Sequence, residues 1–104
     1  MEQAPPVIRD NAEQQRFEID LGGGEFAVAA YKLEPGAIRF THTVVPESHG
    51  GQGLGTALIK AGLAAARERG LKVIPICPFF RAYLKKHPDE QDIVDAEHLY
   101  LLRD

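Results

Sequence analysis

The sequence predicts an α/β (α+β) fold in which an antiparallel meander of strands is followed by a β-α-β crossover and a C-terminal helix. Three observations lead to this class. Residues 16–45 hold three apolar runs separated by glycine- or proline-rich turns. A glycine-rich loop and a helical pattern follow at 50–70, and a strand and a second helical pattern follow at 71–87. Because 104 residues suffice for one small core, we expect a single domain over 1–104, with 1–15 as a loose lead-in.

The three runs of the predicted meander are residues 16–21, 25–33 and 37–45. In the first, apolar residues alternate with charged ones, which is typical of a half-buried strand. Three consecutive glycines and then Glu-Pro-Gly supply the turns between the runs. Strict alternation along the third run would place four residues on one face of the sheet: Ile38, Phe40, His42 and Val44.

The second half of the chain predicts two helices joined by a strand. Apolar residues recur at helical spacing from Leu54, and Gly70 is a suitable stop. Gly62 inside this helix costs about 1 kcal/mol relative to alanine, so it indicates close packing. The strand at 71–77 should lie parallel to 37–45. Because Pro75 cannot donate a ladder hydrogen bond, pairing there must be interrupted or lie at a sheet edge. A second helix should begin near Pro78 and end before residue 88, and the pattern of the tail is ambiguous.

Composition limits the class of protein. A net charge of -3 argues against binding to nucleic acid, and no apolar run is long enough to span a membrane. The first residues lack the pattern of a secretory signal. Cys77 is the only cysteine, which excludes an internal disulfide and a multi-cysteine metal site. We therefore expect a cytoplasmic protein without a metal, and the composition leaves monomer and homodimer open.

The stretch HGGQGLGT, residues 49–56, predicts a phosphate site because it holds four glycines at the start of a helix. Backbone N–H groups and the helix dipole attract anions there. The candidate contacts are Gly50, Gly51, Gln52, Gly53, Leu54, Gly55 and Thr56. A P-loop would need a lysine before Thr56, and a dinucleotide fingerprint would need G-x-G-x-x-G rather than G-x-G-x-G. A tight turn without a ligand is the simpler alternative.

The segment VVPESHGGQGLGTALI resembles the acetyl-CoA pyrophosphate loop of the GNAT acetyltransferase superfamily. Its signature is Arg or Gln, two residues, Gly, one residue, and Gly or Ala. The glycines fall on Gly53 and Gly55, whereas Gly50 stands at the Arg/Gln position; a second register uses Gln52, Gly55 and Ala57. With VIPICPFFRAYLKKHPDE, residues 15–95 are similar to short, single-domain GNAT-like proteins. This resemblance implies a compact GNAT-like mixed sheet with a splay, acetyl-CoA as co-substrate and an unidentified amine acceptor.

The resemblance also implies site residues. The backbone amides of Val44 and Val45 would contact the pantetheine arm. His42 would accept the amine proton, or be a core histidine. Cys77, near a helix N-terminus, would be a nucleophile or proton relay, or a small buried apolar residue. Tyr83 would protonate the leaving thiolate, or be a packed aromatic.

Two functions of different classes follow. The first is an acetyl-CoA-dependent N-acetyltransferase acting on a small-molecule or protein amine. The alternative is a non-catalytic CoA-binding module or sensor, because the helices that normally wall the acceptor site are missing from the pattern. A phosphate-binding protein unrelated to CoA is a third, weaker interpretation.

Overall fold

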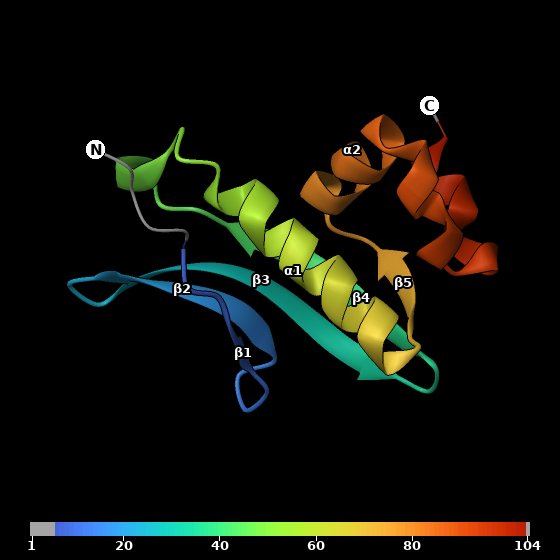
Figure 1. Cartoon of the computed structure of the whole chain (residues 1–104), viewed down its shortest axis with the longest axis horizontal. Helices are drawn as coiled ribbons and strands as arrows, with labels where there is room; N and C mark the ends of the chain where they lie inside the picture. The colour runs from blue at the N-terminus through green and yellow to red at the C-terminus, as the bar shows by residue number, and fades with distance from the viewer. Residues whose placement is uncertain (1–5, 104) are drawn as a thin grey trace.

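The computed structural model describes residues 6–103 and contains one five-stranded sheet in the order β1-β2-β3-β4-β5. The first four strands are antiparallel neighbours, and β5 lies parallel to β4. This arrangement confirms the predicted meander followed by a crossover (Figure 1). The strands are β1 Arg9–Asn11, β2 Arg16–Gly22, β3 Glu25–Glu34, β4 Ala37–Val44 and β5 Lys72–Pro75.

Both predicted helices are present with the expected ends. Helix α1 (Leu54–Arg69) connects β4 to β5 and stops at Gly70, whose φ of 65° suits glycine. Helix α2 (Pro78–Lys86) begins at its proline, with Cys77 as N-cap. Short 3₁₀ helices complete the chain: η1 (Glu47–His49) before the glycine loop, and η2 (Pro88–Ile93) and η3 (Ala96–Leu102) in the tail.

The expectation of a loose lead-in is wrong for part of residues 1–15, because β1 pairs with β2. The cause is Glu18, whose side chain is only 3% exposed. Its carboxylate accepts hydrogen bonds from Asn11 (2.9 Å), Arg16 (2.9 Å) and Arg9. Burial alone would raise the pKa of Glu18. The hydrogen bonds, of which the one from Asn11 has the largest effect, outweigh it and lower the pKa to about 2. Residues 1–5 of the lead-in lie outside the described part of the chain.

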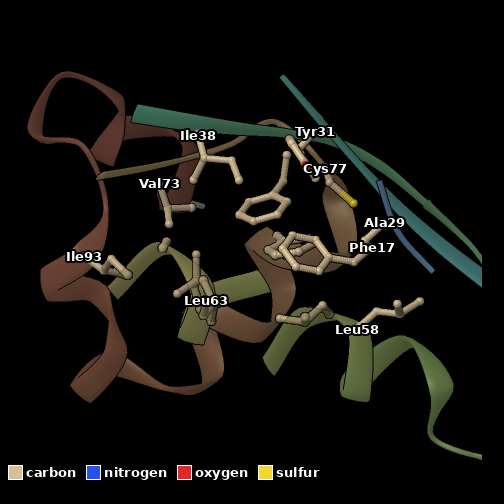
Figure 2. Close-up of a cluster of buried hydrophobic side chains, with 14 of the residues drawn as sticks. Phe17, Ala29, Tyr31, Ile38, Leu58, Leu63, Val73, Cys77 and Ile93 are labelled. Carbon is tan, nitrogen blue, oxygen red and sulfur yellow. The ribbon is translucent and has the colours of Figure 1, made fainter. Parts of the chain in front are cut away.

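The core lies between α1, α2 and one face of the sheet. Figure 2 shows side chains from strands and helices meeting in one cluster, with the Cys77 sulfur among them. The Phe40 and Phe80 rings stack with centroids 4.1 Å apart. A Cβ at Gly62 would lie 2.8 Å from Cζ of Phe40 and 3.3 Å from Cζ of Phe80. This close approach confirms that Gly62 marks tight packing of the helix.

A β-bulge in β4 changes which side chains face the core. Tyr31 pairs with Phe40, but Ala30 pairs with His42, so Thr41 is an extra residue without a partner on β3. Alternation therefore reverses after Phe40. Thr43 is buried on the helix side, whereas His42 and Val44 are exposed on the face opposite the helices. The prediction that Ile38, Phe40, His42 and Val44 share one face is wrong for its last two members.

Candidate functional site

The parallel pair β4 and β5 separates partway along its length. Pairing runs from Ala37 opposite Lys72 to Phe40 opposite Pro75. The last contact is the N–H of Cys77, which donates to the Phe40 carbonyl at 2.9 Å. Pro75 has no N–H to donate, and the chain turns into α2 three residues later. Residues 41–45 therefore have no ladder partner on β5, which is the predicted splay.

The glycine loop points a row of free amides at the start of α1. Gly51 and Gly53 have φ of 79° and 74°, so the loop reverses twice before Leu54. Ala57 is the first residue of α1 to donate a helical bond, to Gly53 (3.0 Å). Among residues 6–103, no carbonyl or side chain accepts a hydrogen bond from the loop amides of residues 51–56. Such a row of N–H groups at a helix N-terminus attracts an anion.

Gly50 differs from the rest of the loop. Its N–H donates to the Glu47 carbonyl at 3.0 Å and so closes η1. The expectation that every amide from residue 50 to residue 56 is available to a ligand is therefore wrong at its first member. A Cβ at Gly50 would lie 3.3 Å from the same carbonyl oxygen, which leaves little room for a side chain. The row of available amides begins at Gly51.

The loop opens into a cleft of about 800 Å³ between α1 and α2. The cleft joins most of the predicted loop residues to Val45 and Tyr83. The predicted residues that line it are Val45, Gly50, Gly51, Gly53, Leu54, Gly55, Thr56 and Tyr83. One elongated site thus connects the helix N-terminus with the strand that carries the splay.

Four predicted residues lie elsewhere. Gln52 lines a second hollow, of about 590 Å³, beside β2. His42 and Val44 are on the opposite face of the sheet, where the Thr41 hydroxyl lies 3.2 Å from Nδ1 of His42. Cys77 is fully buried, and its Sγ lies 3.2 Å from the Thr43 hydroxyl oxygen. The thiol is therefore buried beside Thr43, in the unpaired part of β4, and is not among the residues that line the cleft.

Tyr83 lines the cleft, and its hydroxyl proton already forms a hydrogen bond within the protein. Its hydroxyl donates to Glu90 at 2.6 Å, and its ring stacks on His87 with centroids 4.0 Å apart. The hydrogen bond to Glu90 and, to a smaller extent, burial raise the pKa of Tyr83 to about 12. The phenol is thus held in its neutral, proton-bearing form at neutral pH.

Sequence reasoning missed a second group of cleft residues. Besides the predicted Tyr83, the side of α2 that faces the cleft contributes Phe79, Ala82 and Lys86, and His87 follows at its C-cap. Lys60 faces it from α1. Lys86 and His87, at the C-terminal end of this helix, both line the cleft. The spacing i, i+3, i+4, i+7, i+8 from Phe79 is the signal that could have identified this side.

Residues 6–103 lack two other features, a cluster of metal ligands and a membrane-spanning helix. That stretch contains no group of three or more His, Cys, Asp or Glu side chains able to hold a metal ion. It also contains no helix that is both long enough and apolar enough to cross a membrane.

Comparison with known proteins supports the interpretation of the fold. Residues 16–93 match the model of the GCN5-related N-acetyl-transferase family. Protein NATD1 of Mus musculus is 29% identical over 91 residues, covering 85% of this chain and 83% of that protein. Protein NATD1 of Gallus gallus is 29% identical over 102 residues, covering 95% and 90%. The solution NMR structure of a GCN5-like candidate N-acetyltransferase from Staphylococcus aureus has a TM-score of 0.69 and 32% identity, covering 89% of this chain and 91% of that one.

The mixed sheet, the splay and the glycine loop thus define an acetyltransferase of the GNAT class. The chain belongs to the GCN5-related N-acetyltransferase family, because the family model matches well over half of it. Its general activity is that of an N-acetyltransferase.

Proposed function

We propose that the protein transfers an acetyl group from acetyl-CoA to an amine, and that the loop amides of residues 51–56 hold the coenzyme diphosphate. The observation that carries this proposal is the row of free N–H groups at the mouth of the cleft. A diphosphate accepts several such bonds at once, and the partial positive charge of the helix N-terminus adds to them. The Cβ positions at Gly51 and Gly53 meet nothing within 4 Å, so the backbone is open to a ligand.

The pantetheine arm would follow the free edge of β4 into the splay. In an antiparallel pair, alternate residues point their N–H and C=O groups away from the partner strand. Beyond Phe40, such groups of β4 have no partner on β5. The arm carries amides that can pair with these groups as a short strand would. Val45, which lines the cleft, marks the entry to this path.

The two candidate reacting side chains lie on opposite sides of β4. On the uncovered face, the imidazole of His42 is exposed and can accept the proton of an approaching amine. On the helix side, Cys77 lies next to Thr43 at the N-cap of α2. In the proposed reaction this thiol would protonate the leaving thiolate, or would carry the acetyl group before the amine takes it. The amine nitrogen gains the acyl carbon, the thioester C–S bond breaks, and the amine proton passes to His42.

The test is thiol release from acetyl-CoA by the full chain with a panel of small amines and lysine-containing peptides. Release above the hydrolysis background with at least one acceptor supports the proposal. Calorimetry with CoA in parallel separates binding from turnover. Tight binding without release across the panel would assign a CoA-binding module instead, and the absence of both would overturn the site assignment itself.

A further inference from the structure

More basic than acidic side chains line the cleft, although the chain as a whole is acidic. The whole chain has a net charge of -3. The charged or titratable groups that line the cleft are nevertheless mostly basic: Lys60, Lys86, His49 and His87, against Glu47 and the neutral phenol of Tyr83. The carboxylate of Glu90, on η2, lies beside this wall of the cleft, where it accepts a hydrogen bond from the Tyr83 hydroxyl. The two lysines, Lys60 and Lys86, therefore line the cleft outside the glycine loop, and the loop does not explain their presence there.

The two lysines come from opposite walls of the cleft, Lys60 from α1 and Lys86 from α2. Lys60 follows Thr56 by four residues on α1, a rise of about 6 Å along the same side of the helix. Lys86 lies in the last turn of α2, seven residues from Phe79 on the cleft side. Each ammonium ends a flexible stem with three donors, which suits a terminal phosphate monoester. Within residues 6–103, neither lysine forms a hydrogen bond or an ion pair with the protein.

We propose that Lys60 and Lys86 together bind the 3′-phosphate of the coenzyme ribose and so make the site select CoA over its 3′-dephospho form. The inference rests on the proposed binding of the diphosphate at residues 51–56. One ribose separates the 3′-phosphate from the diphosphate, which is comparable with the single helical turn between Thr56 and Lys60. The 3′-phosphate is a dianion at neutral pH, and one ammonium group from each wall of the cleft would neutralise it. The glycine loop would bind the diphosphate, which CoA and 3′-dephospho-CoA share. The lysine pair would bind the 3′-phosphate, which only CoA carries.

The experiment measures by calorimetry the affinity of the full chain for CoA, 3′-dephospho-CoA and adenosine 3′,5′-bisphosphate. The chain is compared with Lys60→Ala, Lys86→Ala and the double variant. The matched control is Lys32→Ala, because Lys32 is an exposed lysine on β3 outside the cleft. Salt is varied in parallel, since contacts to a phosphate dianion weaken as ionic strength rises.

We expect the wild-type chain to bind CoA more tightly than dephospho-CoA. Each cleft substitution should weaken CoA binding about tenfold and change dephospho-CoA binding less than about twofold. The double variant should bind the two coenzymes equally, and Lys32→Ala should match the wild type. An equal loss for both coenzymes would place the lysines on the diphosphate and overturn the proposal, as would wild-type affinities that do not differ. Failure of every variant and the wild type to bind either coenzyme would instead refute the proposed function.

Discussion

Gly62→Ala tests whether the contact between α1, Phe40 and Phe80 is as close as the structure shows. At an open helical site, alanine in place of glycine stabilises a protein by about 1 kcal/mol. Here the added Cβ would lie 2.8 and 2.9 Å from Cζ and Cε1 of Phe40 and 3.3 Å from Cζ of Phe80. Both rings are fully buried and stacked, so neither can move away freely. Overpacking of this kind costs about 1–3 kcal/mol.

The gain of about 1 kcal/mol from helix propensity and the larger cost of overpacking together predict a net loss of about 1 kcal/mol in the free energy of unfolding. Urea denaturation measures this loss directly. Ala64→Gly, at an exposed position of the same helix, measures the propensity contribution alone and should cost about 1 kcal/mol. In a Phe40→Leu background the ring atoms at 2.8 and 2.9 Å are gone, so Gly62→Ala should become neutral or stabilising. If Gly62→Ala stabilised the otherwise unmodified protein by about 1 kcal/mol, the close approach of α1 to β4 would be refuted.

Three further predictions concern the thiol, the buried carboxylate and the loop. Cys77→Ala should lower the rate of acetyl transfer more than Cys77→Ser, because serine retains a group that can pair with Thr43 and carry a proton; full activity of the alanine variant would dismiss a role for the thiol. Glu18→Gln should lower the free energy of unfolding by about 2 kcal/mol at pH 7, since it weakens the bonds that hold β1. The pKa of Glu18 falls from 4.5 to about 2 on folding, so in the wild type this stabilisation is complete above pH 4.5 and is lost as the pH falls toward 2; identical acid profiles for the wild type and Glu18→Gln would contradict this account. Gly53→Ala should weaken CoA binding by straining a residue with φ of 74°, whereas Gly36→Ala, with φ of 72° in a distant turn, should bear similar strain and bind CoA normally; equal losses in both would exclude a local effect.

Local patterns in the sequence predict most of the fold. The three apolar runs, the turns between them and the ends of the two helices depend on neighbouring residues, and the structure confirms them. Pro75, which has no N–H for the ladder, is consistent with the separation of β4 and β5, because the pairing ends with Phe40 opposite Pro75. Gly62 predicts a close contact but not its partners, since Phe40 and Phe80 come from distant parts of the chain.

The errors arise where distant residues decide the outcome. The polar run Thr41-His42-Thr43 gives no sign of a bulge, so the reversal that exposes His42 is visible only in the pairing with β3. Strand β1 depends on Glu18 being covered by donors from two strands, which no local pattern in the lead-in indicates.

The composition of the site was predicted in part. The loop was identified because glycines at a helix start are a local signal. The face of α2 that carries Lys86 was missed because its importance depends on where α2 lies relative to α1. The burial of Cys77 beside Thr43 likewise follows from the packing of α2 against β4.

A titration of the ¹⁵N-labelled chain with CoA, followed residue by residue through its backbone amide resonances, tests the central claim most directly. The largest changes should fall on Gly51, Gly53, Leu54, Gly55 and Thr56, with small changes at Gly50, whose N–H already donates to Glu47. If CoA bound while these loop amides stayed unchanged, or if the changes clustered on the uncovered face of the sheet, the assignment of the diphosphate site would be wrong.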